Sequence, residues 1–281
     1  MMKMMEAHNK DEVDMPVAGI SIHSTAIVSS KALLGDGVKI GPYCVVGENV
    51  ILGSGVELSS HVNIDGITEI GDNTKIFPFA SIGCPPQDLK YRGEESRVKI
   101  GVNNTIREHV TIHGGTKMGR TETVIGNNCL LMVASHIAHD CVVGDNVIMS
   151  NNATLGGHVV VEDHVVIGGL SAVHQFVRIG RYTIVGGVTG VVADIVPYAS
   201  VAGDRAKILG VNTRGLKRHG IKNDDIVALH QAFEMLFKHS DGSFISRVEK
   251  VAVEYKEIDR VMEVVEFLRN NKIRPICTSF K

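Results

Sequence analysis

The chain has 281 residues, of which 44% are hydrophobic, so it can bury a core in one large domain or two smaller ones. Its 29 lysine and arginine residues and 31 aspartate and glutamate residues leave a formal net charge of -2, which gives no overall positive field for nucleic acid or an anionic membrane. Five cysteines without a CxxC pair indicate reduced thiols, so we expect a cytoplasmic protein. No segment has the apolar length of a signal peptide or membrane span.

Residues 1–19 follow no periodic pattern, and we expect a flexible N-terminal extension there. From Ile22 to Ile82 an aliphatic residue stands at every sixth position, and the same spacing returns from Ile100 to Ile112 and from Ile125 to Val191. A small or β-branched side chain usually follows four residues later. Six residues are too few for a helical repeat, so each hexad predicts one short strand and a corner. Three hexads form one coil, and residues 20–197 are predicted to form a parallel β-helix with coils about 4.8 Å apart.

Two segments interrupt the six-residue spacing. The first follows Gly83, is polar, begins with two prolines and returns to the pattern at Ile100, which predicts a loop extending from the coil. The second, residues 113–124, is one residue out of step and predicts a smaller bulge. Long loops on a rigid scaffold often carry function, although a tolerated surface insertion explains either segment as well.

After Pro197 the hexads stop and apolar residues recur at helical spacing. This pattern predicts a small C-terminal helical domain over residues 198–281; its apolar positions include Ile226, Leu229, Phe233, Leu236, Phe237, Val261, Val264, Val265 and Leu268.

Histidines gather in one part of the predicted β-helix. The hexads that begin at 137, 155 and 173 are eighteen residues apart, lie on one face of successive coils and contain His139, His158 and His174. His136 precedes the same strand, and Asp140 follows His139 directly. Such a cluster could bind zinc, as in the γ-class carbonic anhydrases, or could supply a general base that activates a sugar hydroxyl. We favour the base, because the polar loop with Asp88 and Lys90 and the basic residues near Arg218 suit a phosphorylated substrate.

The sequence closely resembles the bacterial UDP-N-acetylglucosamine O-acyltransferases that begin lipid A synthesis. The strings that carry the resemblance occur in the family's order: QDLKY (87–91), TIHGGT (111–116), HIAHDC (136–141), NNATLGGHV (151–159), AVHQF (172–176) and GVNTRGLKR (210–218). The resemblance covers nearly everything from residue 20 onward. The resemblance implies a left-handed β-helix, an (R)-3-hydroxyacyl donor on acyl carrier protein, a UDP-N-acetylglucosamine acceptor, and a homotrimer with active sites between neighbouring chains. It implies no cofactor and no metal.

The resemblance also implies roles for individual residues. His139 corresponds to the general base, Asp140 to the residue that holds it, and Gly157 to the backbone donor for the oxyanion. Residues that correspond to the family's substrate-binding or cleft positions are Asp88, Lys90, His113, His136, His158, His174, Gln175, Asn212 and Arg218. Arg214 and His219 depart from the family's charge pattern near the nucleotide.

Gly187 corresponds to the position that limits how far the acyl chain extends along the β-helix. It lies eight hexads beyond His139, which corresponds to an axial rise of roughly 13 Å at about 4.8 Å per coil. We expect this glycine to leave room for a long donor, although it could also serve only to ease a corner.

Four rival interpretations stay open at this point. A related N-acyltransferase carries an additional domain before its β-helix, for which the hexads beginning at Ile22 leave no room. Coenzyme A-dependent acetyl- or succinyltransferases and a zinc hydratase share the scaffold. A β-helix used only as a structural or binding module is the remaining alternative, since fold alone does not decide function.

Overall fold

The computed structural model describes residues 19–238, 242–270 and 273–278. In these ranges twenty-eight short strands form three sheets, and up to β26 the chain passes from sheet to sheet in rotation, so that each sheet takes every third strand. Sheet A contains β1 (Ser21–Ile22), β4 (Lys39–Ile40), β7 (Glu57–Leu58), β10 (Lys75–Ile76), β13 (Thr105–Ile106), β16 (Leu130–Leu131), β19 (Ile148–Met149), β22 (Val166–Ile167), β25 (Ile184–Val185), β27 (Ala199–Ala202) and β28 (Lys207–Val211).

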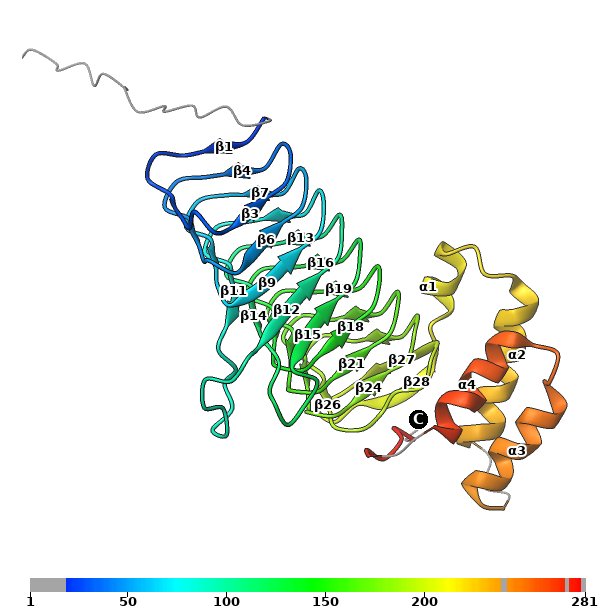
Figure 1. The fold of residues 1–281 in the computed structure, drawn as a ribbon. Helices are drawn as coiled ribbons and strands as arrows, with labels where there is room; N and C mark the ends of the chain where they lie inside the picture. Colours follow the sequence, from blue (N-terminus) through cyan, green and yellow to red (C-terminus); the bar gives the residue numbers. More distant parts are fainter. Residues whose placement is uncertain (1–18, 239–241, 271–272, 279–281) are drawn as a thin grey trace, which may run out of the picture.

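Sheet B contains β2 (Ile27–Val28), β5 (Val45–Val46), β8 (Asn63–Ile64), β11 (Ser81–Cys84), β14 (Thr111–His113), β17 (His136–Ile137), β20 (Thr154–Leu155), β23 (Ala172–Val173) and β26 (Gly190–Val191). Sheet C contains β3 (Leu33–Leu34), β6 (Val50–Leu52), β9 (Ile67–Ile70), β12 (Arg97–Ile100), β15 (Glu122–Ile125), β18 (Val142–Val143), β21 (Val160–Val161) and β24 (Arg178–Ile179). The coils stack along one axis, as Figure 1 shows, and confirm the predicted parallel β-helix.

The aliphatic ladder sets the register between coils. Ile137 pairs with Leu155, which pairs with Val173, so one coil takes eighteen residues as the hexads predict. All three side chains are buried, and alternation along each strand turns the neighbouring residues outward. Chemistry can therefore vary on the outer faces and corners while the interior holds the coils in register.

Both interruptions of the hexads are loops that leave a coil and return to it. Ile70 pairs with Ile100, thirty residues later, so residues 85–96 leave between β11 and β12 and the ladder then resumes. Ile100 pairs with Ile125, so a second loop, residues 114–121, leaves between β14 and β15. Figure 1 shows both loops projecting from the same side of the β-helix.

The C-terminal helical domain begins later in the chain than the end of the hexads at Pro197 predicted. Residues 199–211, which the sequence interpretation assigned to the helical domain, form β27 and β28. β27 continues sheet A parallel to β25, and β28 turns back antiparallel to it. The described residues beyond β28 form the α-helices α1 (Thr213–Arg218), α2 (Asn223–Phe233), α3 (Phe244–Glu254) and α4 (Asp259–Arg269), with a π-helical turn η1 (Glu234–Lys238) after α2.

The helices pack around a small core that contains Phe233, Val264 and Val265. Residues 273–278, here called the C-terminal strap, return to the β-helix, where Ile276 forms a parallel bridge with Asp194. None of the helices in the described ranges has the length and apolar character needed to cross a membrane. The expected flexible extension, residues 1–19, falls outside the described part of the chain except for Gly19.

Candidate active site

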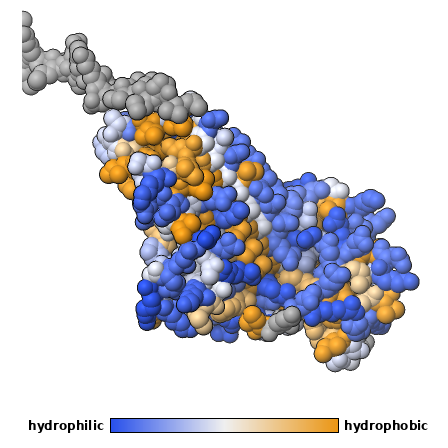
Figure 2. Space-filling view, viewed as in Figure 1, coloured by the Kyte–Doolittle hydropathy of each residue, from blue (hydrophilic) through white to orange (hydrophobic). Residues whose placement is uncertain are grey.

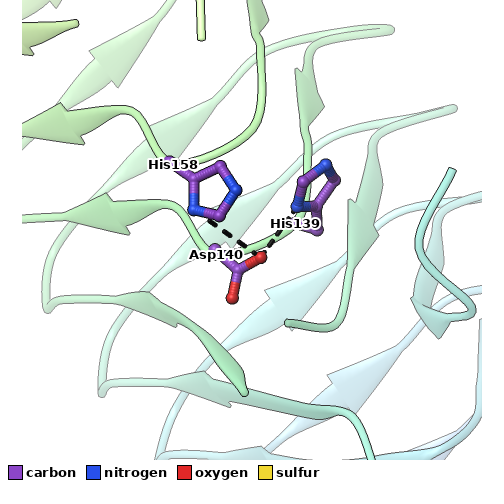
Figure 3. A group of neighbouring side chains, drawn as sticks. All are labelled: His139, Asp140 and His158. Carbon is purple, nitrogen blue, oxygen red and sulfur yellow. Dashed lines mark hydrogen bonds and ion pairs between the residues drawn. The ribbon is translucent and has the colours of Figure 1, made fainter. Parts of the chain in front are cut away.

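His139, Asp140 and His158 converge at the corners between sheets B and C. His139 and Asp140 follow β17, and His158 occupies the position of Asp140 one coil later, after β20. His139 Nδ1 lies 2.8 Å from Asp140 Oδ2, and His158 Nδ1 lies 3.8 Å from the same oxygen. The two imidazoles meet edge to face with their centroids 5.0 Å apart (Figure 3). The corner geometry therefore forms one compact group from residues of two coils.

The second loop holds the Asp140 carboxylate. Thr116 donates its backbone N–H to Oδ1 at 3.0 Å and its hydroxyl to Oδ2 at 2.7 Å, and the Arg120 N–H donates to Oδ1 at 2.6 Å. The Asp140 backbone N–H donates to the Thr123 hydroxyl at 2.9 Å. With the His139 contact, both carboxylate oxygens are fully engaged, which fixes their direction.

These bonds also fix the charge of Asp140. Burial by itself would raise the pKa of this carboxyl, but the bonds from His139, Thr116 and Arg120 outweigh burial and lower the pKa to about 2. An ionised carboxylate only accepts hydrogen bonds, so His139 Nδ1 must be the donor. The neutral ring then carries its lone pair on Nε2, which is the state that a general base requires.

Gly157 lies one coil beyond His139 and against its ring. A β-carbon built on Gly157 would lie 2.6 Å from His139 Nε2 and 2.5 Å from Cε1, so only glycine fits this approach without a shift of the imidazole. Among the described residues, the Gly157 N–H donates to no protein acceptor, whereas the neighbouring His158 N–H is bonded to the His139 carbonyl at 3.0 Å. The residue that lies against the His139 ring thus also carries a backbone donor without a protein acceptor among the described residues.

In the described part of the chain, a metal ion could be held by His139, Asp140 and His158, since one ligand atom from each lies within 4.8 Å of the other two. A metal bound by His139 Nδ1 would displace the proton that this atom shares with Asp140, and a metal bound by Asp140 would compete with the donors from the second loop for the carboxylate. The hydrogen-bonded geometry favours acid–base chemistry over metal binding.

His113 and His136 lie together on sheet B, beside the cluster. Their rings meet edge to face with centroids 5.1 Å apart, and His136 Nδ1 lies 2.7 Å from the Thr111 hydroxyl. Burial, followed by the nearby rings of His136 and His139, lowers the pKa of His113 to about 4, and burial also lowers the pKa of His136. Both rings are therefore neutral at pH 7, so they can form hydrogen bonds with a ligand but contribute no positive charge.

Asp88 and Lys90 lie on the first loop. The Lys90 N–H donates to Asp88 Oδ1 at 2.9 Å, and this local turn shapes the loop tip. Burial lowers the pKa of His158 most, and the negative charges of Asp140 and Asp88 oppose that shift. Asp88 is thus close enough to act electrostatically on His158.

His174 does not join the cluster in the way that its hexad suggested. Phe176, eighteen residues after His158, continues the corner column and stacks on the His158 ring at a centroid distance of 4.4 Å. His174 is two residues earlier in the corner and instead contacts Arg274 of the C-terminal strap, as does the Gln175 carbonyl. Equal spacing of hexads therefore did not imply equal positions within a corner.

Asn212 and Arg218 lie at the two ends of α1. Asn212 is the N-cap, and its side-chain oxygen accepts the Gly215 N–H at 3.1 Å while its amide donates to the Tyr182 carbonyl at 2.8 Å. Arg218 is exposed in the last turn, and His219 packs edge to face against His164 and Tyr182. Asn212, which was predicted to lie near the nucleotide, is therefore also the N-cap of α1.

Gly187 lies at a different corner from His139. It follows β25, where the chain passes from sheet A to sheet B, whereas His139 lies between sheets B and C. A β-carbon on Gly187 would meet the Gly169 carbonyl oxygen at 3.3 Å. The six-residue spacing predicted only the axial rise between His139 and Gly187. The two residues are also separated laterally by the width of sheet B.

Three contributors to the site were missed from the sequence. Thr116 and Arg120 hold Asp140 through a loop, and Arg274 reaches His174 from one hundred residues away. The break in the hexads was a signal for the loop, but no periodicity could indicate its contacts. The sequence offered no signal for Arg274.

A buried carboxylate, an oriented imidazole and a free backbone donor on a hexapeptide β-helix define an acyltransferase of the bacterial hexapeptide-repeat class. Residues 31–66 and 122–157 match the model described as bacterial transferase hexapeptide (six repeats), and residues 194–277 match the model of UDP N-acetylglucosamine O-acyltransferase, domain 2. The fold is accordingly a left-handed parallel β-helix with a small helical C-terminal domain.

Curated relatives make the family plain. Proteins named acyl-(acyl-carrier-protein)–UDP-N-acetylglucosamine O-acyltransferase from Thermodesulfovibrio yellowstonii and Rickettsia prowazekii are 50% and 49% identical to this chain. The matches cover 91% and 92% of this chain and 98% and 97% of the relatives. The solved structure of LpxA from Acinetobacter baumannii is 40% identical with a TM-score of 0.88, and the match covers 91% of this chain and 99% of that one. The chain belongs to this O-acyltransferase family.

Proposed function

We propose that the chain transfers an (R)-3-hydroxyacyl group from acyl carrier protein to the 3-hydroxyl of UDP-N-acetylglucosamine. The observation that carries the proposal is the pairing of His139 with an ionised, fully engaged Asp140, beside the free N–H of Gly157. Family membership supports the choice of donor and acceptor, because the relatives' names state both.

His139 is the proposed general base. Its Nε2 removes the proton from the sugar hydroxyl while that oxygen attacks the thioester carbonyl, and Asp140 stabilises the imidazolium through Nδ1–H. The Gly157 N–H donates to the oxyanion of the tetrahedral intermediate. When the intermediate collapses, the carbon–sulfur bond breaks, and the thiol leaving group takes the proton from His139 Nε2. Neither a cofactor nor a metal enters these steps.

Other residues are proposed to bind the sugar nucleotide. The His158 ring contacts the base, and His136 is close enough for its pKa to respond to the charge of the base. On the first loop, Asp88 acts electrostatically on His158, and Lys90 is two residues further along. The Thr111 hydroxyl and the edge-to-face contact with His113 hold the His136 ring, and both rings are proposed as neutral donors or acceptors for the sugar. Toward the nucleotide we place the remaining residues, namely His174, Gln175, Asn212 and Arg218.

A homotrimer with the site between chains is proposed as the active assembly. His139 and Gly187 occupy different corners of one chain, so an acyl chain that meets both is most simply bound between two neighbours. Exposed apolar side chains also support association, since Ile27 and Leu33 are 69% and 61% exposed. Figure 2 shows hydrophobic residues gathered over the first coils. We further propose a cytoplasmic location, which the five free cysteines support.

The function is tested with purified protein, UDP-N-acetylglucosamine and hydroxyacyl carrier-protein thioesters of several lengths, with products read by mass spectrometry. We expect one added 3-hydroxyacyl group in an ester that hydroxylamine cleaves. An amide product, or no acylated sugar nucleotide with any donor, would contradict the proposal. A chelator should leave the rate unchanged, whereas a zinc hydratase would lose its activity.

A further inference from the structure

The C-terminal strap is anchored immediately after Arg274. The Asp194 N–H donates to the Pro275 carbonyl, and the Cys277 N–H donates to the Asp194 carbonyl, both at 2.8 Å. Cys277 is buried, with its thiol against the Ala206 carbonyl. These contacts involve the backbone of the strap and the Cys277 side chain, so the position of Arg274 does not depend on its own guanidinium.

From this position Arg274 contacts two adjacent groups. Its Nε donates to the Gln175 carbonyl at 3.0 Å, and its Nη2 lies 2.6 Å from His174 Nδ1. A guanidinium only donates hydrogen bonds and stays protonated, so Nδ1 must be the acceptor. His174 Nδ1 also lies 3.3 Å from the Gln175 carbonyl, but that oxygen already receives the Arg274 bond. The neutral ring therefore carries its N–H on Nε2.

We propose that Arg274 is a positioning residue that fixes the ring plane and tautomer of His174, so that the Nε2–H donates to an acceptor oxygen of the sugar nucleotide. The inference rests on the proposed function for the identity of that ligand. His174 is exposed, so its free ring edge can reach a ligand while Arg274 holds the other edge. The C-terminal strap thereby contributes to a site whose proposed catalytic residues all lie on the β-helix.

Steady-state kinetics test the proposal. In Arg274→Ala the ring is free to rotate and to adopt the other tautomer, so we expect the KM for UDP-N-acetylglucosamine to rise about five- to tenfold, the scale of one lost hydrogen bond. The kcat and the KM for the acyl donor should stay near wild type, because the contact binds substrate and transition state alike. Arg274→Lys should recover part of the loss.

Arg269→Ala is the matched control. This arginine is also near the C-terminus, but its Nη2 pairs with exposed Glu249 at 2.6 Å, away from His174. We expect wild-type constants for it. His174→Gln should raise the same KM, and adding Arg274→Ala to that variant should have little further effect, because Arg274 acts through the ring. A full additional loss in the double variant would contradict the proposal.

Nitrogen-15 NMR of the histidine rings gives a reading that is independent of catalysis. The signals of His174, identified by their loss in His174→Gln, should show an unprotonated Nδ1 and a protonated Nε2 in the wild type and a change of that pattern in Arg274→Ala. A protonated Nδ1 in the wild type would overturn the inference. If the wild type acylates no sugar nucleotide, the proposed function fails, and the NMR result still decides whether Arg274 sets the tautomer.

Discussion

His139 and Gly157 approach so closely that a β-carbon on Gly157 would lie 2.6 Å from the Nε2 atom of the imidazole. This relationship joins the proposed base to the proposed oxyanion donor, and it requires a residue without a side chain. Gly157 has no left-handed φ in this structure, so the requirement is one of space and not of backbone conformation.

Gly157→Ala should therefore fold normally and lose activity by about 10²-fold, the scale seen when an oxyanion donor or a base is misplaced. The added methyl group must push the imidazole away from the hydroxyl that it deprotonates. Turnover and thermal unfolding measure the two effects separately. The double variant His139→Ala with Gly157→Ala should be no slower than His139→Ala alone if the methyl group acts through the ring, and additive losses would contradict this account.

His139→Ala should keep its fold and assembly and lose a factor of about 10² to 10⁴ in kcat, the usual contribution of a general base. Its ring is on an outer corner, so the aliphatic ladder is untouched. His61→Ala is the control, because His61 is another corner histidine that stacks between Tyr43 and Phe79, far from the cluster in sequence. Near wild-type turnover in His139→Ala would remove this residue from the mechanism.

Acid should destabilise the fold in a window set by His113. Burial, followed by nearby histidines, lowers its pKa from 6.5 to about 4, so between these values the unfolded chain binds a proton that the folded chain does not. Stability should fall as pH falls from about 6.5 to about 4. Melting temperatures at pH 7.5, 5.5 and 4.5 measure the loss, and His113→Gln should show a smaller one. An equal loss in both proteins would assign the effect to other groups.

Gly187→Met should shift the preferred donor toward shorter acyl chains. A methionine side chain would fill the space beside the Gly169 carbonyl, and each terminal methylene that loses its apolar contact costs up to about 0.8 kcal/mol. Donors of different lengths supplied together, with products read by mass spectrometry, measure the shift against a wild-type preference for long chains. Leu170→Met, one coil earlier on the same corner, controls for the added side chain. Unchanged product lengths would refute the assignment.

The β-helix was predictable because its information is local and repeated. Each buried aliphatic residue, such as Ile137 or Leu155, stands at the same point of a hexad, so one period specifies strand, corner and pairing partner together. The same repeat placed His139, Asp140 and Gly157 correctly relative to one another. The strands β27 and β28 escaped prediction because they extend sheet A without hexads.

The remainder of the site depends on contacts that do not repeat. Spacing placed His174 near His158, but it could not indicate that the side chain turns toward Arg274 instead. Thr116 and Arg120 reach Asp140 because the loop after β14 folds against the corner of the next coil, and the six-residue period does not specify the path of a loop. The repeat specifies the position of a residue along the β-helix axis. The direction of its side chain and the contacts of a loop become known only from the folded structure.

The constant pairing of residues eighteen apart also limits how such a protein can change its specificity. Inserting or deleting a whole coil keeps every residue at its corner, but it moves the two ends of a binding groove by a full step of about 4.8 Å. Any shorter insertion rotates all later residues to the wrong sheet unless it is looped out, as residues 85–96 and 114–121 are. Changes in groove length smaller than one coil therefore have to come from a change of side-chain size at a single corner.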